Sequence, residues 1–90
     1  MFIIYSLIVL SSVTSAKRVE RLATEYSIHA STLHTPKSLT RHGCSHSVKV
    51  KTQDLKQVYQ LAEKLGMEIY GVYDEKNENG KIKYEKVVFR

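Results

Sequence analysis

An uncharged apolar run near the start of the chain, Phe2 to Leu10 (FIIYSLIVL), limits the possible folds more than any other feature. It is too short to cross a lipid bilayer, since a membrane-spanning helix needs about 20 apolar residues. The run is similar to the apolar part of a signal peptide, and SSVTSA follows it as a small-residue end. However, no Lys or Arg precedes it, as a signal peptide would require. We therefore predict that residues 2–10 form an inner β-strand, which suits their Ile, Val and Tyr content.

Two later segments have the periodicity of amphipathic helices. The first follows the apolar run, and either Ser11 or Ser12 can cap its first turn. The second begins near Thr52, another good capping residue, and Gly66 stands where a helix ends in a left-handed turn. The expected apolar faces are Val13, Ala16, Val19, Ala23 and Tyr26 in the first helix, and Leu55, Val58, Tyr59, Ala62 and Leu65 in the second.

Four further segments have the alternation or the residue content of β-strands. Pro36 ends the first of them, because proline has no N–H to donate to a strand ladder. Asn79 and Gly80 predict a hairpin turn between the last two. The expected strands are residues 28–34, 47–51, 67–73 and 81–89.

Together these segments predict an α+β domain with the order β-α-β-β-α-β and one added C-terminal strand. Ninety residues allow a single domain. Two helices on one face of a mostly antiparallel sheet give the split βαβ, or ferredoxin-like, arrangement. We predict this domain over residues 1–74 and a hairpin extension over residues 75–90.

Composition and motifs exclude several functions. One cysteine rules out an internal disulfide framework and a zinc ribbon, and it fits a reducing compartment such as the cytoplasm. No GxGxxG, P-loop, HExxH or GxSxG motif is present, and no carboxylate pair has a spacing that suggests acid–base catalysis. A net charge of +5 attracts acidic partners only weakly. We expect neither an enzyme nor a bound cofactor, and no association with a membrane.

The sole cysteine, Cys44, lies in the one polar, irregular segment with unusual chemistry, PKSLTRHGCS at residues 36–45. Cationic neighbours favour the thiolate, which is the reactive form of cysteine. Gly43 leaves the sulfur approachable and lets the backbone adopt conformations that other residues resist. The loop therefore predicts an accessible, nucleophilic thiol, with a buried cysteine that packs as a small apolar residue as the alternative. The basic neighbours are Lys37, Arg41, His42 and His46.

Two other functions fit parts of the same sequence. His42, Cys44 and His46 are spaced two apart, so an extended segment would point them to one side, as zinc ligands require. His34 or His29 would supply a fourth ligand. A small metal-binding or protein-interaction module that uses these residues is the alternative to a reactive thiol. Structural zinc sites generally use more cysteines, so we predict no stoichiometric zinc and assign no metal ligands. Six tyrosines and the positive charge suit RNA binding by an aromatic sheet face. The aromatic-rich RNP1 pattern is absent, so we do not expect nucleic acid as a partner.

Three stretches carry a resemblance to known proteins: IVLSSVTSAKRVERL, TPKSLTRHGCSHSVKV and DLKQVYQLAEKLGMEIYGVY. Together they cover about residues 3–73 and are similar to the selenium/sulfur carrier protein-like family, a domain of unknown function found mainly in bacteria. Its members open with an apolar strand and carry a Pro-to-Cys loop before a later strand. Two residues depart from the pattern, since Lys37 stands where the family has Arg, and His42 precedes Gly43 where a second Gly or Ser is more usual.

The resemblance implies a carrier rather than a catalyst. Cys44 would hold sulfur or selenium as a persulfide or selenopersulfide and pass it to a partner protein, without a cofactor. The expected partners are sulfur or selenium donor and acceptor proteins. Because a persulfide is anionic at neutral pH, Arg41, Lys37 or a protonated histidine would stabilise it. The loop residues expected to support Cys44 are Pro36, Lys37, Arg41, His42, Gly43 and His46.

Overall fold

A computed structural model describes residues 5–39 and 45–87 of the chain. Two helices, α1 and α2, and one short 3-10 turn, η1, lie between or beside the strands in this part of the chain. The elements in order are β1 (Tyr5–Leu10), α1 (Val13–Glu25), β2 (Ala30–His34), η1 (Lys37–Leu39), β3 (His46–Lys51), α2 (Thr52–Lys64), β4 (Ile69–Glu78) and β5 (Lys81–Lys86).

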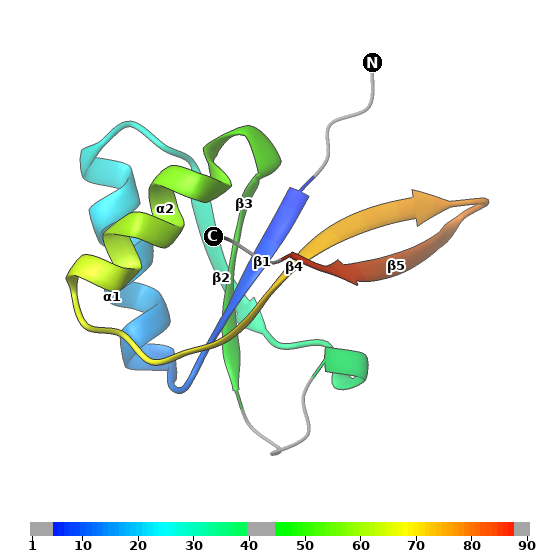
Figure 1. The fold of residues 1–90 in the computed structure, drawn as a ribbon, viewed down its shortest axis with the longest axis horizontal. Coiled ribbons are helices and arrows are strands. Elements are labelled where there is room, and N and C mark those ends of the chain that lie inside the picture. The colour runs from blue at the N-terminus through cyan, green and yellow to red at the C-terminus, as the bar shows by residue number, and fades with distance from the viewer. Residues whose placement is uncertain (1–4, 40–44, 88–90) are drawn as a thin grey trace.

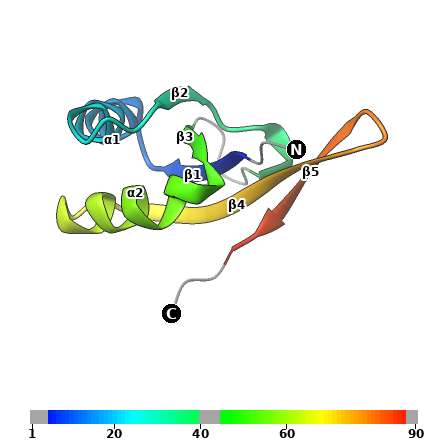
Figure 2. The same ribbon diagram turned by 90° about the horizontal axis from the view of Figure 1, so that it is seen from above.

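The five described strands form one antiparallel sheet in the order β2-β3-β1-β4-β5. Both helices pack against one side of this sheet, and the β4–β5 hairpin extends away from them (Figure 1). Figure 2 shows the helices and the hairpin at opposite ends of the molecule. The predicted α+β, ferredoxin-like fold with an extra C-terminal strand is therefore confirmed. Within the described ranges, no helix is long and apolar enough to cross a membrane.

Strand β1 lies at the centre of the sheet, between β3 and β4. This confirms the prediction of an inner strand for the part that the structure describes, while residues 2–4 lie outside it. Ile8 and Leu10 point into the core beneath the helices, and Leu7 and Val9, on the other face of the strand, are buried as well. Burial on both faces explains why the run is continuously apolar rather than alternating.

The core is one cluster formed by the helices and the strands beneath them. Three alanines, Ala16, Ala23 and Ala62, bring the helix backbones close to the sheet. Its other members are Ile8, Leu10, Val19, Ile28, Ala30, Val48, Val50, Leu55, Val58 and Val72, with Tyr59, Met67, Ile69 and Val87 packed against it. Burial of this apolar surface is the main stabilising contribution in a domain of this size.

Helix α1 begins as predicted, but its apolar face is shorter than predicted. Ser12 is the N-cap, and its Oγ accepts a hydrogen bond of 3.2 Å from the Ser15 N–H. Val13 and Tyr26 are 44% and 54% exposed, so their assignment to the buried face was wrong. Val13 opens the first turn, and Tyr26 is the C-cap beyond the last turn, where the helix no longer faces the sheet.

Helix α2 differs from the prediction at both ends. Strand β3 runs directly into the helix, so Lys51 occupies the N-cap position without a side-chain cap, and the prediction of Thr52 as the cap was wrong. The Thr52 hydroxyl instead donates to Ser6 Oγ at 2.8 Å, because Ser6 gives its own proton to Asp74 Oδ1 at 2.6 Å. At the other end Leu65 is the C-cap and is 40% exposed, so the prediction that it lies on the apolar face was wrong.

Glycine and asparagine stand where the backbone takes positive φ angles. Gly66 has φ +71° just after α2, which confirms the predicted left-handed end. Asn79 and Gly80 have φ +51° and +81° between β4 and β5, as the predicted hairpin turn requires.

The hairpin itself carries opposite charges on facing strands. Lys76 forms an ion pair with Glu85, and Lys83 lies 3.3 Å from Glu78. The hydrogen bond and charge of Glu85 raise the pKa of Lys76. Burial, and secondarily the charge of Glu75, raises the pKa of Tyr84. The division of the chain into residues 1–74 and 75–90 stays a prediction.

Candidate functional site

The candidate site is the segment that joins β2 to β3, residues 35–45. Its first part contains Pro36 and Lys37, which the structure describes, and His46 is the first residue of β3 after it. The predicted thiol, Cys44, lies outside the described residues. Arg41, His42 and Gly43 also lie outside them, so the structure brings together only the residues at the two ends of the segment.

A buried polar cluster closes the base of this segment. The Thr35 N–H donates to the Ser45 carbonyl oxygen at 3.1 Å, which continues the β2–β3 ladder by one step. The hydroxyls of Thr35 and Ser47 share a hydrogen bond of 2.7 Å. Thr35, Ser45 and Ser47 are all buried. The residue that follows Cys44 in the chain therefore has a fixed backbone and little contact with water.

Immediately after Thr35, the chain makes one 3-10 turn. The Leu39 N–H donates to the Pro36 carbonyl oxygen at 2.9 Å, and the turn η1 begins at Lys37. Proline suits the residue that opens such a turn, because its φ is already near the helical value. The sequence predicted an irregular segment here and gave no sign of the turn. Lys37 is exposed, so its ammonium group is available to anions at the surface.

Two histidines lie side by side at the same base. His34 and His46 are register partners on β2 and β3, and their ring centroids are 4.6 Å apart with a tilt of 41°. The sequence identified His46 as a neighbour of the thiol and His34 only as one possible extra metal ligand. The antiparallel register of β2 and β3 places the two histidines opposite each other. To predict the pair from the sequence one must know this register, which depends on the loop length and on the polar cluster beneath the loop.

The base of the loop also lies near the start of α1. β1 ends at Leu10, which pairs with His46, and α1 begins three residues later at Val13. Figure 1 shows the start of α1 and the start of β3 at the same end of the sheet. The first turn of a helix carries N–H groups without partners in the helix, together with the positive end of its dipole. This end of the molecule therefore favours negative charge.

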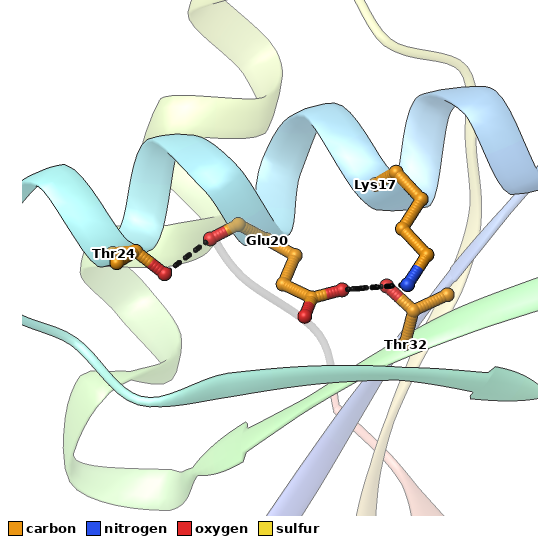
Figure 3. Close-up of polar contacts among 4 residues, drawn as sticks. All are labelled: Lys17, Glu20, Thr24 and Thr32. Carbon is orange, nitrogen blue, oxygen red and sulfur yellow. Dashed lines mark hydrogen bonds and ion pairs between the residues drawn. The ribbon is translucent and has the colours of Figure 1, made fainter.

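One polar contact joins α1 to β2, and two further contacts of the same glutamate lie within α1 (Figure 3). Thr32 on β2 donates a hydrogen bond to Glu20 Oε2 on α1, and the Thr24 hydroxyl donates to the Glu20 carbonyl oxygen at 3.0 Å. Lys17 Nζ lies 3.6 Å from the same carboxylate. Beyond these contacts, the outer surface of α1 has a depression lined by Val13, Thr14, Lys17, Arg18 and Arg21, so it is cationic.

The metal centre considered from the sequence lies only partly within the residues that the structure describes. In residues 5–39 and 45–87, no three His, Cys, Asp or Glu side chains gather closely enough to hold a metal ion. Of the metal-ligand set considered from the sequence, His42 and Cys44 lie outside these ranges.

The fold and the candidate site together define the class of protein. It is a small ferredoxin-like domain with a polar β2–β3 loop that contains its only cysteine. Residues 5–74 match the family model described as "Putative Se/S carrier protein-like". The chain belongs to this family, and the resemblance seen in the sequence is confirmed. The match runs from the first residue of β1 into β4 and includes the whole β2–β3 loop. A search of curated proteins finds no significant match.

Proposed function

We propose that this protein carries sulfur or selenium on Cys44, as a persulfide or selenopersulfide, and transfers it to a partner protein. The observation that carries the proposal is the family match, which spans residues 5–74 and contains the only cysteine of the chain. No other side chain type in the loop can form a bond to sulfur that is made and broken so readily. The proposed partners are a donor protein that loads the thiol and an acceptor protein that unloads it.

The transfer itself is a thiol exchange. The Cys44 thiolate would attack the outer sulfur of a donor persulfide, the sulfur–sulfur bond of the donor would break, and the donor would leave as a thiolate. An acceptor thiolate would then take the outer sulfur from Cys44 in the same way. Each step exchanges one sulfur–sulfur bond for another, so no oxidant, metal or cofactor is needed. We therefore propose a carrier without catalytic activity of its own.

Three features support this chemistry. The Thr35–Ser45 and Thr35–Ser47 hydrogen bonds fix the backbone beside the cysteine. The start of α1 lies at the same end of the sheet and favours an anion there. Lys37 is exposed near the beginning of the loop, and Arg41 adds a second cation in the sequence. A thiol that must stay reduced also fits our prediction of a cytoplasmic protein.

The experiment that tests the proposal is persulfide loading followed by intact mass measurement. The reduced protein is treated with a small-molecule polysulfide, and a gain of one sulfur atom per chain is expected. Cys44→Ser should take up no sulfur. Ser38→Ala is the matched control, because it alters an exposed residue of the same segment but keeps the thiol, and it should load as the wild type does.

Alkylation of the native protein provides the second readout. We expect iodoacetamide to modify Cys44 in the folded chain and to do so at lower pH than a free cysteine, because cations favour the thiolate. Cys44→Ser should leave the free energy of unfolding nearly unchanged, as for an exposed residue. The proposal fails if the thiol reacts only after denaturation and the variant loses several kcal/mol, as a core residue would. Zinc that co-purifies with the wild type but not with Cys44→Ser would favour a metal-binding module instead.

A further inference from the structure

We propose that His34 and His46 form a two-histidine binding site for a divalent late transition metal ion such as Ni²⁺ or Zn²⁺. The site lies at the end of β2 and β3, at the base of the cysteine loop. It uses only side chains that the structure describes, and it does not depend on the carrier function of Cys44. The neutral imidazole is the side-chain group that these ions bind most commonly in proteins.

The spacing of the two rings matches that of two ligands on one metal. Their centroids are 4.6 Å apart. Metal–nitrogen bonds of about 2.0–2.1 Å place the centroids of two imidazoles roughly 4.5 Å apart at an N–metal–N angle near 90°, and roughly 5.2 Å apart at the tetrahedral angle. The rings are tilted by 41°. On this proposal, rotation about the side-chain torsions aims one nitrogen of each ring at the shared ion.

The strands hold the two histidines in place before any metal binds. His34 and His46 are direct register partners, so their Cβ atoms face each other across the β2–β3 ladder. The next step of the ladder is closed by the Thr35–Ser45 hydrogen bond and by the buried Thr35–Ser47 pair. Two flexible side chains lose conformational entropy when they bind one ion, and this loss is their main cost. Two histidines that are already ordered lose little of it.

The exposure of the two histidines leaves the site open to solvent. β2 is an edge strand, His34 is exposed, and His46 is half-buried beside it. Among the residues that the structure describes, neither imidazole takes part in a salt bridge. Water molecules would fill the remaining coordination positions, as is usual for an ion held by few protein ligands. Binding of this kind is exchangeable, so it is compatible with the prediction of no stoichiometric zinc in the purified protein.

The test is calorimetric titration of the reduced protein with a nickel salt at neutral pH. We expect one Ni²⁺ per chain, with an affinity at least about tenfold weaker in His34→Phe and in His46→Phe. Phenylalanine keeps a ring against its neighbour and removes only the ligand nitrogen, so these variants should fold. The double variant should bind no more weakly than either single variant, because one histidine alone forms no chelate.

Two control variants separate this site from the other histidines and from the thiol. His29→Phe, at an exposed position before β2, should bind Ni²⁺ as the wild type does. Cys44→Ser should also bind with unchanged affinity. The proposal is overturned if His34→Phe binds normally, if Cys44→Ser abolishes binding, or if the wild type takes up no nickel. A melting temperature measured without metal, within a few degrees of the wild type for every variant, ensures that lost binding reports lost ligands.

Discussion

Small side chains with hydroxyl groups stabilise the local structure around the candidate site through buried hydrogen bonds. Ser6, Thr35, Ser45 and Ser47 are the polar residues that are buried in the described part of the chain. In these ranges, no buried side-chain nitrogen or oxygen lacks a hydrogen-bond partner. Serine and threonine are common in loops and on surfaces, so their residue types alone did not reveal that three of them close the base of the β2–β3 segment. Their partners become visible only once the register of the strands is known.

The Thr35–Ser47 pair should therefore be important for stability. Thr35→Val keeps the volume but leaves the Ser47 hydroxyl buried without its partner, so we expect a loss of about 1–3 kcal/mol in the free energy of unfolding, measured by urea titration. The double change Thr35→Val with Ser47→Ala should recover part of that loss, because no unpaired group is left. Ser31→Ala, an exposed position on β2, is the control and should change stability by less than about 0.5 kcal/mol. Equal stability of Thr35→Val and wild type would show that the pair contributes little.

At the level of helices and strands, sequence periodicity gave the correct type and order of every main element. It was wrong at the ends. Tyr26 and Leu65 continue the apolar spacing of their helices, but each is a C-cap beyond the sheet and is exposed. Thr52 is a residue type that commonly caps helices, but β3 leads straight into α2. The Thr52 hydroxyl therefore does not cap the helix and forms a hydrogen bond with Ser6. Ends of elements depend on where the neighbouring element stops, which periodicity within one segment does not encode.

Asn79 and Gly80 predicted the turn between β4 and β5 more specifically than any other residues predicted local structure. Gly80 has φ +81°, and a Cβ added there meets no other atom within 4 Å. Gly80→Ala is therefore opposed by backbone strain alone, and we expect it to destabilise the protein by about 1–2 kcal/mol in urea unfolding. Gly80→Asn is the matched variant and should lose less, because asparagine tolerates this conformation better. If alanine and asparagine are equally harmful, a cause other than backbone conformation is responsible.

On the scale of the whole molecule, the two helices and strands β1 to β4 surround the core, and β5 lies at the edge of the sheet. The residues of the core cluster lie in or next to these elements. Val87, just after β5, also packs against the cluster. The fold was predictable because the order of helices and strands admits few topologies. The surroundings of the candidate site were predictable only in part: the place of the loop between two strands followed from the strand patterns on either side of Pro36. The cross-strand pairs Thr35–Ser47 and His34–His46 did not, because they join residues twelve apart through the register.

A chain that ends at Glu78 tests whether the family region folds without the final strand. It retains every residue of the core cluster and loses only Val87 among the partly buried apolar residues that pack against the cluster. We expect cooperative unfolding with a free energy lower by about 1–2 kcal/mol, since full burial of a valine contributes about 1.5–3 kcal/mol. Val87→Ala in the full-length chain should account for much of this loss. Because β4 becomes an open edge, gel filtration must accompany the urea titration to detect association. Persulfide loading at one sulfur per chain should be unchanged, since the β2–β3 loop lies at the opposite edge of the sheet from β5. A truncated chain that is unfolded would mean that the hairpin is an integral part of the domain rather than an extension of it.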